Sequence, residues 1–268
     1  MKRSGMVTLL TDFGLKDPYV GMMKGVILTV NPAARIIDIS HHVKAGAIGQ
    51  AAHILRETYP YFPKGTVHVT VVDPGVGSKR RAIIVMAQSH LFVGPDNGMF
   101  WPIIDLHQNI KIIHITETKY FLRDVSETFH GRDIFAPVAA HLSMGADPFE
   151  MGTAISDPVK LQLPAPHQEG NTLYGEIVHV DHFGNLITNI HRKEIERFIG
   201  NSRQVIGLGD LIIEGMRRTY AEAIPGEALA LIGSSDNLEI AVNLGRADNK
   251  LGLDLKRIVG MEVKVIKG

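Results

Sequence analysis

One short segment of the chain combines residue types that could hold and direct a reacting molecule. Residues 70–85 read TVVDPGVGSKRRAIIV, in which Asp73 ends an apolar run, a Pro-Gly-Val-Gly turn follows, and three cations come next. A carboxylate can direct a water molecule or accept its proton. We expect the glycines to fold a turn tight enough for Asp73 to meet Arg80, whereas Lys79 and Arg81 are expected to be solvated.

Further polar residues stand where other predicted strands end. Asp12 directly follows a predicted strand at 6–11, and Asn97, in a Pro-Asp-Asn-Gly turn, directly follows another. His130 stands just before a predicted helix. Because ligands of open α/β sheets bind at the carboxyl ends of the strands, these residues and Asp73 together predict one site. The alternatives are turn chemistry for the aspartates and a capping or core role for His130.

Several familiar motifs can be excluded. The turn at 74–78 lacks the G-x-x-x-x-G-K-[ST] spacing of a phosphate loop, and a β-branched run rather than a helix follows it, which also excludes a dinucleotide fingerprint. The tripeptide DFG at 12–14 stands without any other kinase motif. His41, His42 and His53 lack the spacing of metal ligands. We therefore expect no metal site and no cofactor.

The elements that must position these residues alternate between strand and helix over the first 150 residues. Strands are predicted at 6–11, 35–40, 66–72, 81–86, 90–95 and 110–116. Helices are predicted from Pro18, with Asp17 as the N-cap, and over 47–59 and 131–145. This alternation predicts an α/β fold, with a layered sheet in an N-terminal domain of residues 1–160.

The pattern changes after a segment with three prolines at 156–171, which is predicted to be a linker. Short strands with turn signals between them are predicted at 172–181, 185–190, 204–208, 227–233, 237–242 and 261–266. This pattern predicts a small C-terminal β-barrel domain over residues 170–268, with a β-sandwich as the alternative.

The composition limits the classes of partner. The chain has 268 residues with a formal net charge of +0, so nothing in the charge indicates nucleic acid or an anionic membrane as partner. It has no cysteine, which excludes disulfides, thiolate nucleophiles and zinc–sulfur sites. No stretch reaches the roughly 18 apolar residues of a membrane span. We expect a soluble protein of the cytoplasm.

Five segments in order closely resemble one known family. They are LLTDFGLKDPYVGMMKGVI (9–27), VVDPGVGSKRRAI (71–83), VGPDNG (93–98), TFHGRDIFAPVAAHL (128–142) and VDHFGNLITN (180–189). Together they resemble the S-adenosyl-L-methionine hydrolases, or SAM hydroxide adenosyltransferases, which are relatives of the fluorinases and chlorinases. The resemblance implies an N-terminal α/β domain, a C-terminal β-barrel and a homotrimer with its sites at subunit interfaces.

The resemblance also implies a reaction. Members of the family convert the small molecule S-adenosylmethionine and water to adenosine and methionine, using an Asp-Arg-His set. The matching residues here are Asp73, Arg80 by spacing, and His130. In the halogenases the position of Asp73 is not Asp, so this sequence departs from them in the hydrolase direction.

Substrate contacts follow from the same motifs. Asp12 matches the ribose-binding Asp, Asn97 lies on the turn near the ribose, Asn185 suits the edge of adenine and Phe183 could stack on it. Asp17 and Asp181 match positions near the methionine amine. Ser234 and Ser235 match the carboxylate-binding pair, although the halogenases have Arg at the second position. Phe183 could instead lie in the core, Glu239 is a further candidate that could instead lie on a solvated strand face, and the role of Tyr19 is left open.

The chemistry requires water in line with ribose C5′. Methionine leaves as a neutral group, so no acid is needed to protonate it. We hypothesise that the Asp73–Arg80 pair fixes the direction of the water, and that the helix dipole keeps His130 neutral, able to orient the water or accept its proton. Which group takes the proton is left open. The alternatives are a halide-dependent adenosyltransferase and a non-catalytic adenosine or S-adenosylmethionine sensor.

Overall fold

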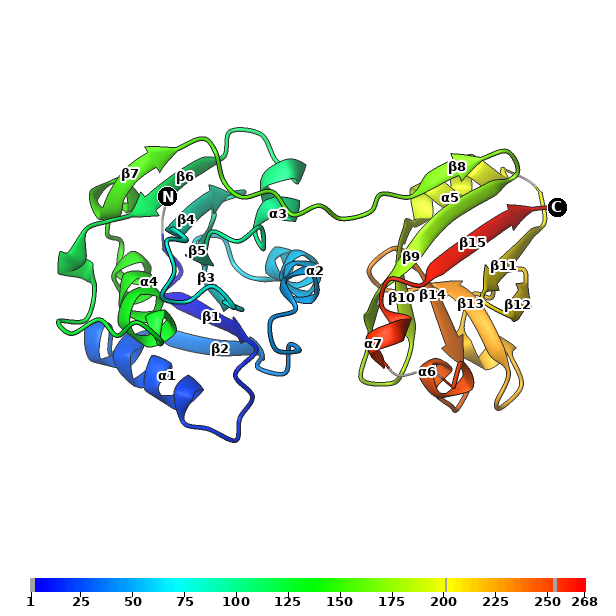
Figure 1. Ribbon diagram of the computed structural model, residues 1–268, viewed down its shortest axis with the longest axis horizontal. Helices are drawn as coiled ribbons and strands as arrows, with labels where there is room; N and C mark the ends of the chain where they lie inside the picture. Colours follow the sequence, from blue (N-terminus) through cyan, green and yellow to red (C-terminus); the bar gives the residue numbers. More distant parts are fainter. Residues whose placement is uncertain (1–2, 201, 253–254) are drawn as a thin grey trace. The chain divides into compact units, whose positions relative to one another are not determined.

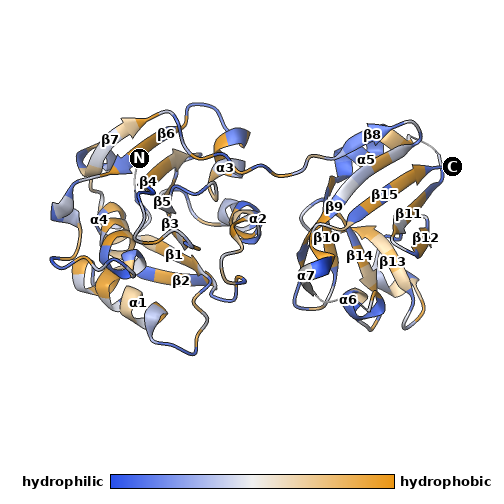
Figure 2. Ribbon diagram, viewed as in Figure 1, coloured by the Kyte–Doolittle hydropathy of each residue, from blue (hydrophilic) through white to orange (hydrophobic). Residues whose placement is uncertain are grey.

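The computed structural model describes residues 3–200, 202–252 and 255–268 (Figure 1). The chain forms two compact units, the first ending at Gln162 and the second beginning at Leu163. Most strands of both units are largely hydrophobic, whereas β8 is hydrophilic and the connecting loops are mixed (Figure 2). None of the helices in the described part of the chain is long and apolar enough to cross a membrane.

A seven-stranded mixed sheet organises the N-terminal unit, in the order β2-β1-β3-β5-β4-β6-β7. Its strands are β1 (Met6–Thr11), β2 (Arg35–Ser40), β3 (Val67–Val71), β4 (Ala82–Ala87), β5 (His90–Pro95), β6 (Lys111–Ile115) and β7 (Gly152–Ile155). The β2-β1-β3-β5 part is parallel, and β4, β6 and β7 run antiparallel to their neighbours. Nearly every residue of β1, β3 and β5 is buried, as expected of strands covered on both faces.

Helices cover both faces of this sheet (Figure 1). On one face lie α1 (Tyr19–Val30) and α4 (Ala136–Met144), and on the other α2 (Ile48–Thr58) and α3 (Trp101–Leu106). Consecutive residues of β1 separate the two cores, because Leu9 belongs to the cluster with α1 and α4 and Leu10 to the cluster with α2.

The order of the strands creates a crevice beside β1. From β1 the chain passes through α1 to β2 on one side, and then through α2, on the opposite face, to β3 on the other side. The carboxyl ends of β1 and β3 therefore form a topological switch point, where the helices on either side diverge and leave room for a ligand. Asp12 and Asp73 lie at these two ends.

The connection from β3 to β4 brings Arg80 to the same edge. Because β5 runs parallel to β3 and β4 runs antiparallel to β5, the start of β4 lies at the same edge of the sheet as the end of β3, with β5 between them. The turn is held by Val76 N donating to the Asp73 carbonyl at 3.2 Å. Gly77 has a φ of +76°, and a Cβ there would lie 2.5 Å from the Glu127 carbonyl oxygen, so only glycine fits.

The C-terminal unit is an antiparallel sheet in the order β12-β11-β15-β9-β10-β14-β13, with β8 paired to β9. Its elements are β8 (His167–Glu169), β9 (Thr172–Val180), β10 (Leu186–His191), α5 (Arg192–Ile199), β11 (Gln204–Leu208), β12 (Leu211–Glu214), β13 (Ala228–Ile232), β14 (Asn237–Val242), α6 (Ala247–Lys250), α7 (Leu255–Ile258) and β15 (Glu262–Lys267). The first and last strands of the order approach each other, so the sheet is a nearly closed barrel. The predicted fold class, an α/β sheet followed by a small β-barrel, is confirmed.

Several details differ from the sequence prediction. Pro18, not Asp17, occupies the N-cap position of α1, and no side chain caps this end. The helix predicted from residue 131 begins as a π-helical turn, η3 (Gly131–Phe135), before α4. The helices α3, α5, α6 and α7 and the strands β7, β8 and β12 were not predicted, and β8 lies within the segment 156–171 that was predicted to be a linker.

Arg81, expected to be solvated, is paired instead. Its Nε donates to the buried carboxylate of Asp96 at 2.8 Å, and its Nη1 donates to Asp157 at 2.8 Å. Asp96 also accepts from Val159 N at 2.9 Å. Arg81 thus ties the ends of two strands to the segment that leaves the sheet.

A buried histidine makes the stability of this unit dependent on pH. His68 on β3 is fully buried, its Nδ1 lies 2.8 Å from Thr8 Oγ1 and its Nε2 lies 3.2 Å from His90 Nδ1. Burial, with a smaller effect of His90, lowers the pKa of His68 from 6.5 to about 3. Between these two values the unfolded chain binds a proton that the folded protein does not, so stability falls as the pH falls through this window.

We predict that His68→Gln flattens this acid dependence. The variant should be less stable at pH 7 by about 1–3 kcal/mol, because packing and a hydrogen bond are altered. Below pH 6.5 its free energy of unfolding should fall less steeply than that of the wild type, by up to about 1.4 kcal/mol per pH unit. Urea unfolding at several pH values between 7 and 4 gives the free energy of unfolding of both proteins as a function of pH. Equal slopes for the wild type and the variant would contradict a lowered pKa of His68.

Candidate active site

Asp73, Arg80 and His130 meet at the carboxyl edge of the N-terminal sheet. The guanidinium of Arg80 binds Asp73 through two nitrogens, with Nε 3.0 Å from Oδ1 and Nη2 donating to Oδ2. The same Nη2 lies 2.7 Å from Nδ1 of His130. Both side chains of the ion pair are largely buried, 5% exposed for Asp73 and 10% for Arg80. The three residues expected to form one set do lie together.

The contact between Arg80 and His130 defines the tautomer of the imidazole. A guanidinium has donors and no acceptor, so Nδ1 of His130 must accept, and the ring proton then lies on Nε2. Burial, followed by the charge of Arg80, lowers the pKa of His130 below its ordinary value of 6.5. The ring is neutral at pH 7, as expected, but the largest cause is burial rather than the helix dipole.

A cavity of about 460 Å³ opens beside these residues. Its lining consists of Phe13, Tyr19, Val71, Asp73, Val76, Ser126, Thr128, Phe129, His130, Gly131 and Arg132. Most of these residues come from three segments, which follow β1, end β3 and precede η3. The cavity therefore lies at the switch point of the sheet, and its volume is in the range of small-molecule sites.

The other predicted residues of this unit lie at the same edge but outside the lining. Asp12 accepts from Gly46 N at 2.9 Å through Oδ2. Asn97 donates from Nδ2 to the Val72 carbonyl at 2.8 Å, which fixes the end of β5 against the end of β3. Asp17 is exposed, two residues before α1.

His41, one of the three histidines whose spacing does not suit a metal site, makes structural contacts. His41 Nδ1 lies 2.8 Å from Thr11 Oγ1, and His41 Nε2 lies 3.1 Å from Asp38 Oδ1. The His41 backbone carbonyl accepts from Gly14 N at 2.7 Å, so this histidine holds the loop that carries Asp12. Over the described residues, no group of three or more His, Asp or Glu side chains is arranged to hold a metal ion.

In the C-terminal unit the predicted residues fall on two loops and one strand. The loop between β9 and β10 is closed by Asp181, whose carboxylate accepts from Asn185 N at 2.9 Å and from Asn185 Nδ2 at 3.0 Å. Phe183, at the tip, is 70% exposed, so the alternative of a core role is wrong. Ser234 and Ser235 form the turn between β13 and β14.

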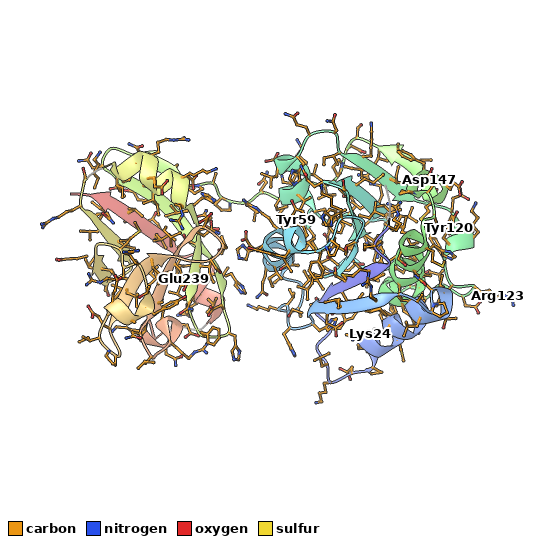
Figure 3. The ribbon with its side chains drawn as sticks, turned by 180° about the vertical axis from the view of Figure 1, so that it is seen from behind. Lys24, Tyr59, Tyr120, Arg123, Asp147 and Glu239 are labelled. Atoms are coloured by element: carbon orange, nitrogen blue, oxygen red, sulfur yellow. The ribbon has the colours of Figure 1, made fainter. Side chains whose placement is uncertain are left out.

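Glu239 on β14 is buried, so the alternative of a solvated strand face is wrong (Figure 3). Its Oε1 accepts from the hydroxyl of Tyr220 at 2.5 Å. Burial raises the pKa of Glu239, and burial together with this hydrogen bond raises the pKa of Tyr220. The sequence reasoning missed Tyr220, which begins the short 3-10 helix η5 (Tyr220–Glu222) in a segment without a motif and is paired with a residue 19 positions away.

Comparisons with known proteins follow the same division of the chain. The model of the SAM hydroxide adenosyltransferase N-terminal domain matches residues 7–152, and the model of the C-terminal domain of the same family matches residues 175–260. A relative from Salinispora tropica named (R)-S-adenosyl-L-methionine hydrolase is 37% identical, over 92% of this chain and 94% of its own length. A relative of the same name from Thermus thermophilus is 36% identical, over 97% and 99%.

A more distant relative and a solved structure also match most of the chain. A fluorinase from Actinoplanes sp. is 28% identical, over 89% of this chain and 91% of its own length. The crystal structure of an uncharacterized conserved protein from Thermotoga maritima matches with a TM-score of 0.91 at 36% identity, covering 97% of this chain and all of that one. With both domain models matched in order over most of its length, the chain belongs to the SAM hydroxide adenosyltransferase family.

Proposed function

We propose that this protein hydrolyses S-adenosyl-L-methionine to adenosine and L-methionine, by attack of water at ribose C5′. The observation that carries the proposal is the Asp73–Arg80–His130 cluster beside the cavity, in a chain whose relatives at 35–37% identity are named (R)-S-adenosyl-L-methionine hydrolase. Their name specifies the (R) form, so we propose that this sulfonium form is the better substrate.

The chemistry suits a site of this kind. The ribose C5′ atom is already activated because it is bonded to the positive sulfonium sulfur. Methionine leaves as a neutral thioether, so the enzyme needs no acid, metal or other cofactor for the leaving group. The main requirement is a water molecule held in line with the bond that breaks. Positioning of this kind can lower a barrier by several kcal/mol, up to roughly 7–11 in ideal cases.

The geometry suggests separate roles for the three residues. Because Nδ1 of His130 accepts from Arg80, its Nε2 carries hydrogen and can donate to the water oxygen, but it cannot take the water's proton in this tautomer. The oxygens of Asp73 retain lone pairs beyond those bound by Arg80. We assign Asp73 as the acceptor of the water's proton and Arg80 as the group that fixes both partners.

The substrate contacts are proposed from the family resemblance. Asp12 and Asn97 bind the ribose, and Asp17 and Asp181 bind the methionine amine. Ser234 and Ser235 bind the methionine carboxylate. Asn185 and Phe183 bind the adenine, and Glu239 is a further contact. The bond from Asn185 Nδ2 to Asp181 leaves the amide oxygen of Asn185 facing a defined direction, which suits an amino group on the base.

We further propose that the enzyme acts in the cytoplasm as a homotrimer. In this assembly, the Asp73 set of one subunit and the C-terminal residues of another serve the same substrate molecule, as the family resemblance implies. Most soluble oligomers are symmetric, so all sites would be equivalent.

Product analysis tests the activity. The wild type should release adenosine and methionine in a 1:1 ratio, faster from the (R) epimer than from the other, and at the same rate with chloride, fluoride or a metal chelator added. Asp73→Asn, Arg80→Ala and His130→Ala should each lower turnover by about 10²-fold or more, because Asp73 is the proposed general base and the other two position it and the water. A halogenated nucleoside would overturn hydrolysis, and tight binding without products would indicate a sensor.

The pH dependence tests the role of His130. Since its pKa is lowered below 6.5, turnover should stay constant as the pH falls to 6.5 and decline only below that value, when the ring becomes cationic and the Nδ1 contact with Arg80 is lost. His130→Asn should retain a fraction of the activity without this decline. Measurement of kcat/KM from pH 8 to 5 decides; a decline already above pH 6.5 would contradict a neutral His130.

Mixing of two inactive variants tests the shared site. Arg80→Ala and Asn185→Ala alter residues proposed to come from different subunits. Mixed trimers, made by co-expression, should recover about a quarter of the wild-type activity, because that fraction of sites contains neither substitution. Arg80→Ala mixed with His130→Ala, both in the N-terminal unit, is the matched control and should stay inactive. Equal failure of both mixtures would place each site within one subunit.

A further inference from the structure

Three aromatic rings line the cavity beside the proposed catalytic residues and have no role in the mechanism above. Phe13 and Tyr19 have ring centroids 5.9 Å apart, Phe13 and Phe129 5.8 Å, and Tyr19 and Phe129 5.3 Å. All three pairs are edge-to-face. We refer to Phe13, Tyr19 and Phe129 as the aromatic trio.

The backbone next to His130 allows this arrangement. Phe13 and Phe129 pack against the core of the N-terminal unit, and Tyr19 lies at the outer end, 45% exposed. A Cβ at Gly131 would lie 3.3 Å from Cε2 of Phe129 and 3.4 Å from Cζ of Phe13. The two inner rings therefore converge on the glycine that directly follows His130, so the trio and the proposed water site share one cavity.

The charges around the cavity are already paired. Asp73 is the single carboxylate among the lining residues, and it binds Arg80. Arg132, the lining cation, binds the buried carboxylate of Asp133 with Nε 2.6 Å from Oδ1. A substrate cation in this cavity thus meets no unpaired carboxylate among the described lining residues, and the aromatic rings offer it a further attractive surface.

One ring of the trio already contacts a cation. The guanidinium carbon of Arg132 lies 5.1 Å from the centroid of Phe129, within the range of a cation–π contact. The proposed substrate carries its charge on the sulfonium, which is bonded to the carbon that water attacks. A sulfonium is bulky and weakly hydrated, and aromatic walls suit such cations.

We propose that the aromatic trio binds the sulfonium group and selects it over a neutral thioether. This inference rests on the proposed function, because it takes S-adenosylmethionine as the ligand. The positive charge disappears as the carbon–sulfur bond breaks, so the trio stabilises the ground state more than the transition state. Its contribution is to affinity and to selection of the charged substrate, not to the rate of the chemical step.

The test compares two ligands that differ in charge. S-adenosylhomocysteine lacks only the sulfonium methyl group and is neutral at sulfur. All proteins carry Asp73→Asn, which suppresses turnover. Calorimetry gives the dissociation constants of both ligands for the protein with Tyr19 unchanged and for the variants Tyr19→Phe and Tyr19→Leu. We expect Tyr19→Leu to weaken S-adenosylmethionine by about 2- to 5-fold, the range of a partly exposed cation–π contact, and to leave S-adenosylhomocysteine unchanged. Tyr19→Phe should behave like Tyr19.

Two controls make the result specific. Tyr61 is 84% exposed and lies outside the cavity, so Tyr61→Leu should change neither ligand. In the active enzyme, Tyr19→Leu should raise KM and leave kcat unchanged or higher. Equal weakening of both ligands, or no change in either, would overturn the proposal. Because binding is measured without turnover, an absence of hydrolysis in the wild type would refute the proposed function and not this inference.

Discussion

The buried ion pair between Asp73 and Arg80 is the interaction on which the arrangement of the site depends. Burial removes both charges from water, which is tolerated only because the guanidinium meets the carboxylate through two nitrogens. Arg80 then has one N–H left on Nη2 for His130, and this contact fixes the tautomer of the imidazole. One guanidinium thus orients both groups that are proposed to act on the water.

The sheet supplies the convergence that the ion pair requires. Asp73 follows the parallel strand β3 and Arg80 precedes the antiparallel strand β4, and both lie at one edge because β5 is parallel to β3 and antiparallel to β4. The turn between them passes close to the Glu127 carbonyl, where glycine alone fits at position 77. Packing at this point therefore connects the turn to the segment that leads to His130.

Local patterns predicted much of the fold. The bounds of β1, β2, β11 and β14 match the predicted ranges, because each is a short run of β-branched and apolar residues between turn signals. The helix α5 was missed although its start has a capping box, since His191 takes the position usually held by Ser or Thr. The pairing of Asp73 with Arg80 was predicted from strand ends and the family resemblance, and a neutral His130 from the helix dipole. The contact of Arg80 with His130 Nδ1, which fixes the tautomer, and burial as the main cause of the lowered pKa of His130 depend on distances that no local pattern contains.

Arg80 and Arg81 are neighbours in sequence but bind different partners. Arg80 binds Asp73 and His130 at the cavity, and Arg81 binds Asp96 and Asp157, which secures the chain where it leaves the sheet. Both residues stand just before β4 and reach different partners, so the partner of each depends on its position along the chain. Counted from Asp73, loss of a single residue from the turn would bring Arg81 into the place of Arg80 and Ala82 into the place of Arg81, and gain of one would bring Lys79 into the place of Arg80. The length of this turn is therefore as tightly constrained as the identity of the residues it carries.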